Sequence, residues 1–374
     1  MKKLFKGLFK ILLIGIILMC LVNALGILDF SDFMQISKEE NKKYSNYYFN
    51  NLDEEEKRIY IKMAKTIEEN KTEFKFLNIK DGDIDKKIDK VFNAYVNDNP
   101  EIFYLSNRYV TLTKTVLVFE YNSVIIQYDS TVDIEKGKEK INTAADDFLK
   151  GLIYSNMSDF EKEIAIHDKL VSKVKYYEYE KISEIPNIKH TAYGALVEHE
   201  AVCDGYSKAF KILLDKVGIE NIIALGILQE ESHAWNIVKI GNDYYHTDVT
   251  SDVLKENNKR YAIHAYFNLS DNEVLRTHEI DNNFELPVCN NDKYNYYIYT
   301  DNILKATDDI SSRLKTIIRN NSNKEVLEFK DQGNSSSTKI IDTLYELDFD
   351  RWMTRGVTNI KYNKIDNMYV FKKF

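Results

Sequence analysis

The sequence is poor in the residues that stabilise small or irregular proteins. Its 374 residues include only 3 cysteines, 3 prolines and 13 glycines. Three cysteines without Cys-x-x-Cys spacing exclude a disulfide scaffold, a cysteine-rich zinc site and a dithiol redox site. Little glycine and proline excludes collagen and low-complexity disorder. Because 26 tyrosines and 19 phenylalanines supply a large core, the chain is globular and long enough for two or three domains.

The sequence also lacks an excess of positive charge. The chain has 51 basic and 59 acidic residues, which gives a formal net charge of −8 at pH 7. Lys2, Lys3, Lys6 and Lys10 precede the first acidic residue, so the remainder of the chain is more acidic still. Because proteins bind nucleic acid through basic surfaces, we expect no nucleic-acid partner.

Long apolar runs are limited to residues 11–28, where Asn23 is the one strongly polar residue. A lysine-rich start followed by such a run is typical of an export signal, and this run is long enough to cross a bilayer. We therefore predict a signal anchor over residues 1–28, a single transmembrane helix with the C-terminal bulk extracellular. Cleavage near Ala24 would instead give a secreted protein, and a lipid anchor on Cys20 fits less well because the residue before it is large. Abundant Lys, Asn, Ile and Tyr indicate a low-GC bacterial source.

After this segment the sequence predicts a linker and three α+β segments. Residues 29–50 are polar and form the linker, residues 51–155 an N-terminal domain, residues 156–285 a central domain and residues 286–374 a C-terminal domain. The order of the expected helices and strands favours an α+β fold over repeating βαβ units.

Apolar spacing and flanking residues predict the individual elements. In the first domain we expect a helix capped by Asp53, a helix that stops before Pro100, a strand meander at 103–110, 116–121 and 124–128, and a helix over 133–152. In the central domain we expect helices over 160–174 and from Cys203, then strands at 222–228, 234–240 and 243–249. In the last domain we expect a strand at 296–299, helices at 310–318 and 340–347, a strand at 326–329, and a hairpin ending at 368–371.

Cys203 is a candidate nucleophile because of its place before an amphipathic segment. The apolar stripe of that segment consists of Ala209, Phe210, Leu213, Leu214 and Val217, and Gly218 follows as a helix C-cap. Cys203 therefore lies at or near the N-terminus of a buried helix, where the helix dipole favours a thiolate. The alternative is a small buried hydrophobic residue, which is the role of most lone cysteines.

A predicted hairpin supplies two partners for this thiol. His233 begins an alternating strand, and Asp248 ends the next strand after the Gly241-Asn242 turn. Because the turn lies near the midpoint between them, we expect the two side chains to meet across the hairpin. A cysteine at a helix N-terminus, a histidine, and a carboxylate that orients the histidine are what thiol catalysis requires. We predict Cys203 as nucleophile, His233 as general base and acid, and Asp248 as the orienting carboxylate.

Three segments, Ala201-Val-Cys-Asp-Gly-Tyr, His233-Ala-Trp-Asn and Asp248-Val-Thr, resemble the motifs of the transglutaminase-like superfamily. They occur in the expected order in the middle third of the chain. The flanking Ala192-Tyr-Gly-Ala-Leu and Tyr266-Phe-Asn-Leu-Ser-Asp segments are similar to those of bacterial exported members. The resemblance implies a papain-like core with the cysteine on a helix and the histidine and aspartate on neighbouring antiparallel strands.

The same resemblance implies a range of activities. Members of the superfamily include cross-linking enzymes, peptidases, deamidases and amidases, and some have lost the cysteine. The active members form a cysteine thioester with an amide carbonyl and pass the acyl group to water or to an amine. We expect such an enzyme here, without a cofactor, acting on extracellular or cell-wall-associated protein or peptide, with hydrolysis slightly favoured. The alternatives are a protein-glutamine amine transferase and a non-catalytic cell-surface binding or scaffold protein.

Two other groups of residues are weaker candidates for metal sites. A zinc site formed by Cys203, His233, His246 and Asp248 lacks the tight spacing of catalytic zinc ligands, so no metal is expected. The Asp81–Asp85 segment resembles a calcium loop but has neither the glycine nor the final glutamate that such a loop needs.

The remaining candidates have mainly structural interpretations. Tyr206 and Trp235 flank the predicted triad and are candidates for the substrate pocket, although aromatic residues there more often pack in the core. His167 sits on an amphipathic helix and is expected to be structural or exposed. Cys289 is expected to be an ordinary free thiol in a polar loop.

Overall fold

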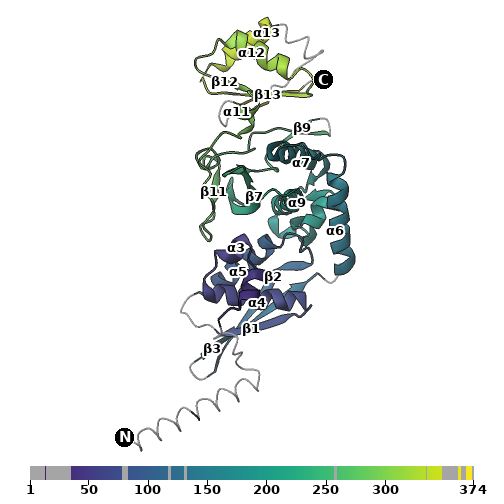
Figure 1. Cartoon of the computed structure of the whole chain (residues 1–374), viewed down its shortest axis with the longest axis vertical. Helices are drawn as coiled ribbons and strands as arrows, with labels where there is room; N and C mark the ends of the chain where they lie inside the picture. The colour runs from purple at the N-terminus through teal and green to yellow at the C-terminus, as the bar shows by residue number, and fades with distance from the viewer. Residues whose placement is uncertain are drawn as a thin grey trace, which may run out of the picture. The chain divides into compact units, whose positions relative to one another are not determined.

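The computed structural model describes residue 13 and residues 35–77, 83–116, 119–129, 133–256, 259–333, 335–347, 361–363 and 368–372 (Figure 1). Apart from residue 13, the predicted signal anchor lies outside the described residues. Among those described, no helix has the length and apolar content needed to span a bilayer. The chain separates into two compact units, residues 1–138 with 283–285 and residues 139–282 with 286–374. The division at 51–155, 156–285 and 286–374 stays a prediction.

The first unit combines helices with a three-stranded antiparallel sheet. Its elements are α2 (Lys38–Lys43), α3 (Tyr47–Asn50), α4 (Glu54–Glu68), β1 (Glu73–Leu77), α5 (Ile84–Asp98), β2 (Leu105–Val116) and β3 (Phe119–Tyr128). The Asp53 side chain accepts hydrogen bonds from the backbone N–H groups of Glu55 and Glu56 and so caps α4. Both predicted helices of this region are confirmed, and α5 ends before Pro100.

The predicted three-stranded meander is wrong. Strands β2 and β3 form one long hairpin, and the third strand is β1, which precedes α5 and pairs with β3. Asn122 and Ser123 indicate a turn by residue type but lie inside β3. Thr113 donates a hydrogen bond to Asn122 at 2.8 Å, and Ser123 donates one to Glu73. Cross-strand hydrogen bonds thus engage the Asn122 side-chain oxygen and the Ser123 hydroxyl, groups that would otherwise favour a turn.

Helix α6 (Ile134–Leu149) contains the boundary between the units, and the second unit then builds a helix-on-sheet core. Its elements are α7 (Asp159–Lys173), β4 (Lys175–Tyr176), η2 (Ile182–Glu184), η3 (Asn187–His190), α8 (Ala192–Leu196), β5 (Glu200–Ala201), α9 (Cys203–Lys216), β6 (Asn221–Leu228), β7 (Glu231–Ile240), β8 (Asp243–Thr247), β9 (Val253–Glu256), β10 (Lys259–Ala262), α10 (Asp271–Val274) and β11 (His278–Ile280). Four of these strands form an antiparallel sheet in the order β11-β6-β7-β8. Helix α9 packs on β6 and β7 with Phe210 and Leu213 fully buried.

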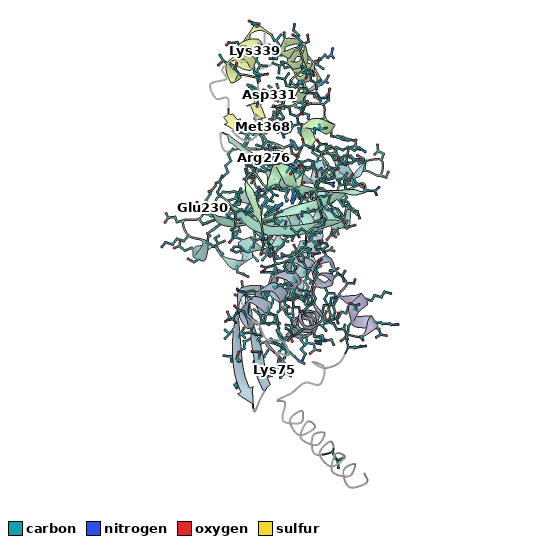
Figure 2. All side chains as sticks on the ribbon, turned by 90° about the vertical axis from the view of Figure 1, so that its left-hand side faces the viewer. Lys75, Glu230, Arg276, Asp331, Lys339 and Met368 are labelled. Carbon is teal, nitrogen blue, oxygen red and sulfur yellow. The ribbon has the colours of Figure 1, made fainter. Side chains whose placement is uncertain are left out.

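Strands β6 and β7 meet at a tight turn that fixes the register of the site. Gln229 and Glu230 form this turn with φ of 51° and 70°, and Figure 2 shows Glu230 at the edge of the ribbon. The resulting register pairs Gly226 with His233. The turn therefore sets where the predicted catalytic histidine stands on the sheet.

The C-terminal part of the second unit has a core of its own. Its elements are α11 (Tyr296–Tyr299), β12 (Ile303–Leu304), α12 (Ile310–Asn320), β13 (Val326–Asp331), α13 (Ser337–Glu346), β14 (Lys361–Asn363) and β15 (Met368–Lys372). The sheet order is β12-β13-β15-β14, and α12 and α13 pack beside it (Figure 1). The strand predicted at 296–299 is wrong, because the Asn295 side chain accepts a hydrogen bond from the Tyr297 N–H and caps a short helix there.

Gly226 on β6 pairs with Ile280 and lies against the backbone of β11. A Cβ atom there would lie 1.9 Å from the Glu279 carbonyl oxygen. We expect Gly226→Ala to lower the free energy of unfolding by about 1–3 kcal/mol, because the added methyl forces the strands apart. Urea unfolding measures this change. Ile227→Ala on the same strand, whose side chain is 41% exposed, is the control with a change within about 0.5 kcal/mol. Equal losses in both variants would contradict the argument.

Candidate active site

Cys203 is the first residue of α9. The parallel pair β4–β5, which aligns Tyr176 with Ala201, holds the chain immediately before it. Val202 precedes the helix with an extended backbone and makes no side-chain cap. The positive end of the helix dipole is therefore available to the sulfur, which is partly exposed.

The first turn of α9 packs tightly on the preceding segment. The Val202 N–H donates to the Lys189 carbonyl oxygen at 3.0 Å. A Cβ atom at Gly205 would lie 2.6 Å from the same oxygen, so only glycine fits there. Close backbone packing thus fixes the position of the thiol.

Hydrogen bonds also join α9 to the strand that carries the histidine. Ser207 Oγ lies 2.9 Å from the Cys203 carbonyl oxygen and 3.0 Å from that of Ala234. Asn236 Nδ2 donates to the Ser207 carbonyl oxygen at 3.1 Å. These contacts are almost all buried and set the helix bearing Cys203 against β7 in one position.

His233 on β7 meets Asp248 directly after β8. His233 Nε2 lies 2.9 Å from Asp248 Oδ2, which leaves Nδ1 as the ring nitrogen for Cys203. Burial alone would lower the pKa of His233, but the Asp248 charge and hydrogen bond, with a further contribution from Cys203, raise it to about 10. The imidazolium is therefore the stable form beside the thiol at neutral pH.

Asp248 is buried among hydrogen-bond donors. Its Oδ1 accepts from the Thr250 N–H at 3.0 Å and from the Thr250 hydroxyl at 2.6 Å, and its Oδ2 lies 3.3 Å from His278 Nε2. Burial would raise the pKa of Asp248, but the charge of His233 and the hydrogen bonds from both histidines hold it well below its usual range. The carboxylate stays ionised and fixes the His233 ring.

Residues 146–249 match the family model of the transglutaminase-like superfamily. The region is a transglutaminase-like domain. The match ends one residue after Asp248 and includes Cys203 and His233.

Two solved structures are also similar to parts of the chain. A crystal structure of a TGase is 14% identical with a TM-score of 0.26, and 51% of this chain and 53% of that one are covered, so the chain spans about half of that protein. A candidate cysteine protease from Cytophaga hutchinsonii is 12% identical with a TM-score of 0.25, covering 44% of this chain and 73% of that one. No curated protein sequence matches the chain.

The sequence did not point to three residues that lie near the site. His278 on β11 contacts Asp248 and lies edge-on to the Trp235 ring, with centroids 4.8 Å apart. Burial is the main cause of the raised pKa of Tyr176 and of Tyr179, and the Cys203 charge contributes to both. Tyr176 also pairs with Ala201, two residues before the thiol. The run of tyrosines in the sequence after α7 could have pointed to Tyr176 and Tyr179, whereas no pattern in the sequence around His278 pointed to that residue.

The aromatic residues predicted for the substrate pocket lie in the core of the domain. Tyr206 and Trp235 are each 1% exposed. The Tyr206 hydroxyl donates to the Val174 carbonyl oxygen, and Trp235 Nε1 donates to His246 Nδ1 at 2.9 Å. The Trp235 ring lies nearly parallel to that of His233, with centroids 6.2 Å apart, so it supports the histidine from the core side.

The alternative zinc set is not assembled among the described residues. His246 Nδ1 accepts from Trp235, and its Nε2 lies 2.9 Å from Asp271 Oδ1, so this histidine is engaged away from Cys203. Residues 81 and 82 of the calcium-like segment lie outside the described residues, and Asp83 caps α5. Cys289 is a free thiol, as expected, but it is fully buried, and burial raises the pKa of its thiol.

The different surroundings of Cys203 and Cys289 predict different reactivity. We expect iodoacetamide at pH 7 to alkylate Cys203 at least about 10-fold faster than Cys289, because only Cys203 is accessible and next to a cationic imidazole. Peptide mass spectrometry over time measures both rates. His233→Ala is expected to slow Cys203 and leave Cys289 unchanged. Equal rates at the two cysteines would contradict thiolate activation.

Proposed function

We propose that this chain is a thiol-dependent acyl-transfer enzyme that acts on amide bonds of protein or peptide. The observation that carries the proposal is the 2.9 Å contact of His233 Nε2 with Asp248 Oδ2 in a domain whose Cys203 opens a buried helix. The match to the transglutaminase-like superfamily supports the same class of chemistry. Catalysis by this set requires no cofactor.

The proposed reaction has two steps. The Cys203 sulfur attacks the amide carbonyl carbon, and the carbon–nitrogen bond breaks as the His233 imidazolium gives its proton to the leaving amine. The resulting thioester is then attacked by water or by a second amine, with neutral His233 accepting the proton of the attacking group. Asp248 keeps the imidazole oriented and stabilises its charged form throughout.

We propose hydrolysis as the second step and a substrate outside the cell. Water is the acceptor at highest concentration there, and the lysine-rich apolar segment at residues 1–28 favours export with retention in the membrane. Tyr176 and Tyr179, which are half-buried and whose pKa values the Cys203 charge raises, are the candidates for contacting the acyl part of the substrate.

Incubation with a glutamine-bearing protein and a labelled amine separates the two acceptors. Ammonia or new peptide ends without incorporated label are expected for a hydrolase. Incorporated label would instead establish the amine transferase. Mass spectrometry of an acyl group trapped on Cys203 identifies the substrate, and no acyl-enzyme with any amide substrate would favour a binding or scaffold protein.

A further inference from the structure

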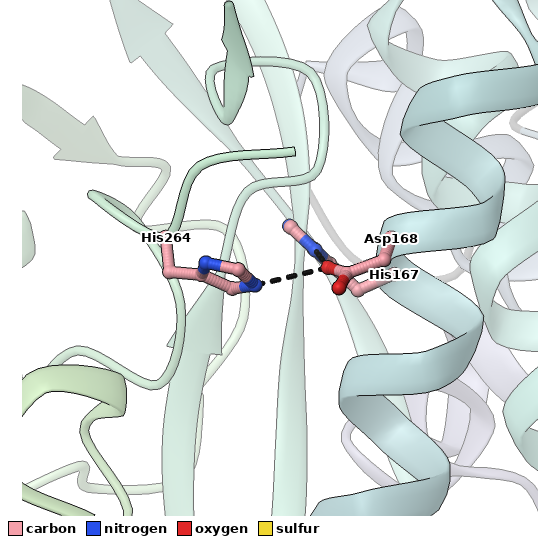
Figure 3. A group of neighbouring side chains, drawn as sticks. All are labelled: His167, Asp168 and His264. Atoms are coloured by element: carbon pink, nitrogen blue, oxygen red, sulfur yellow. Dashed lines mark hydrogen bonds and ion pairs between the residues drawn. The ribbon is translucent and has the colours of Figure 1, made fainter. Parts of the chain in front are cut away.

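A second group of polar side chains meets in the same unit without any of the catalytic residues. His167 and Asp168 lie on α7, and His264 reaches them from the segment after β10 (Figure 3). Asp168 Oδ1 lies 3.0 Å from His167 Nδ1 and 2.9 Å from His264 Nε2. All three atoms lie within 4.8 Å of one another. Tetrahedral zinc with bonds of about 2.0–2.1 Å places its ligand atoms roughly 3.3 Å apart, which is near both distances to Asp168 Oδ1, and the two histidine nitrogens would move together to reach it.

In each histidine, the ring nitrogen that does not face Asp168 lies near another carboxylate. His264 Nδ1 lies 2.5 Å from Glu328 Oε1, and His167 Nε2 lies 3.2 Å from Asp252 Oδ2. A neutral imidazole has one N–H, and donation of it to the outer carboxylate leaves a lone pair on the nitrogen that faces Asp168. A bound cation could then take the place of the ring protons that otherwise bridge the two histidines to Asp168.

Outer carboxylates of this kind are typical of metal-binding histidines. They fix the tautomer and the ring orientation, and they increase the basicity of the ligating nitrogen. Both His167 and Asp252 are fully buried, and within the described part of the chain His167 Nε2 and Asp252 Oδ2 have no polar contact other than the 3.2 Å contact between them. The two atoms therefore have only each other, at ion-pair distance, to compensate for burial.

The group is open to solvent on one side. Asp168, His264 and Glu328 line a cavity of about 720 Å³, and the Asp168 side chain is 46% exposed. The basic residues Lys259, Arg260 and Lys324 also line the cavity; Arg260 Nε donates to the Val171 carbonyl oxygen and Lys324 Nζ to the Tyr296 hydroxyl. Neither of these hydrogen bonds directs a cationic group at Asp168.

Two other groups of histidine and carboxylate in the described residues differ from this one. His246 accepts from Trp235 on Nδ1, so its Nε2 carries the proton that Asp271 accepts, and it has no free lone pair. Asp248, between His233 and His278, is already saturated with donors from Thr250 and Ser251. Of the three groups, the one around Asp168 has a carboxylate at the outer nitrogen of each histidine and adjoins a cavity.

We propose that His167, Asp168 and His264 bind one divalent transition-metal ion of the zinc type. Two histidines and one carboxylate leave a coordination position for water on the cavity side. Asp252 and Glu328 orient the two rings. Because Glu328 belongs to β13, the ion links the transglutaminase-like domain to the C-terminal sheet.

Zinc titration of the full-length protein tests the site. After EDTA treatment and dialysis, we expect one Zn²⁺ per chain by elemental analysis, with the affinity measured by competition with a chromogenic chelator. Asp168→Asn is expected to weaken binding by more than about 100-fold, and Glu328→Gln by about 10–100-fold, the range for loss of an outer partner. Cobalt substitution should give a d–d absorption band that Asp168→Asn removes.

His278→Gln is the matched control, because it alters the group around Asp248 and leaves the proposed ligands intact. It should retain zinc binding. Asp168 is half-exposed and asparagine is similar in shape, so circular dichroism should show a folded variant. Zinc should raise the thermal midpoint of the wild type with the logarithm of its free concentration, and not that of Asp168→Asn. No bound zinc in the wild type, or binding lost in His278→Gln and kept in Asp168→Asn, would overturn the proposal.

Discussion

Replacement of Cys203 by alanine is expected to abolish turnover of amide substrates. The variant lacks the only atom in the proposed site that can form a thioester, and neither His233 nor Asp248 can take over that role. Loss of a covalent nucleophile typically lowers kcat by roughly 10⁴-fold or more, with the residual rate due to substrate binding and oriented dipoles. Ammonia release or cleavage of a peptide substrate, followed under single-turnover conditions, measures the loss.

The control for this variant is Cys289→Ala. Its thiol is buried beside Ala224, Trp235 and Ile237 in the core, so the change affects packing and leaves the nucleophile in place. We expect Cys289→Ala to lower stability modestly and to retain activity when folded. Activity retained in Cys203→Ala, or lost in a folded Cys289→Ala, would place the nucleophile elsewhere. Cys203→Ser is expected to be nearly as inactive as the alanine variant, since the hydroxyl is far less acidic than a thiol.

The features that the sequence predicts correctly are those that depend on residues close together in the chain. Asp53 caps α4, Cys203 opens α9, and the Gly241-Asn242 turn joins β7 to β8. Each depends on a few consecutive side chains with a strong local preference. The contact of His233 with Asp248 was predictable because the two residues share one hairpin, and the position of Cys203 because it begins a helix.

The features that the sequence does not predict depend on pairing between distant segments. Strand β1 joins β3 across the intervening helix α5, so its partner cannot be inferred from spacing. His278 reaches Asp248 only because β11 pairs with β6, about fifty residues earlier in the chain. The carboxylates that face His167 and His264 likewise come from segments far along the chain. Polar networks in a core are set by these tertiary contacts rather than by local propensity.

Replacement of Asp248 by asparagine is expected to lower kcat/KM by roughly 10³–10⁴-fold at neutral pH, the loss typical of removing the orienting carboxylate of a triad. Asparagine preserves the shape of the side chain, so the loss reports charge and tautomer instead of packing. The Asp248 charge and hydrogen bond are the main factors that raise the pKa of His233 to about 10 against the effect of burial. In the variant burial acts without that compensation, and the pKa of His233 should fall below its usual value.

The direction of the pH effect follows from this shift. The proposed first step needs the His233 imidazolium, so wild-type activity should persist through neutral pH and decline as pH rises toward 10. In Asp248→Asn the decline should move several pH units lower. Stability changes in the same sense, because a raised pKa of His233 stabilises the folded wild type below about pH 6.5, and this contribution is lost as pH rises through about 10.

His278→Gln provides the matched comparison for the pH profile. Glutamine can still donate a hydrogen bond to Asp248, whose charge is unchanged, so the alkaline limit of kcat/KM should stay near the wild-type value. A histidine titration by NMR in the two variants distinguishes the effect on His233 from general damage. Two results would show that the carboxylate is not what holds His233 protonated. One is an unchanged alkaline limit of kcat/KM in Asp248→Asn, and the other is a shift in His278→Gln as large as the shift in Asp248→Asn. The predicted contrast arises because one variant removes the charge beside the imidazole and the other removes only a neighbour of that charge.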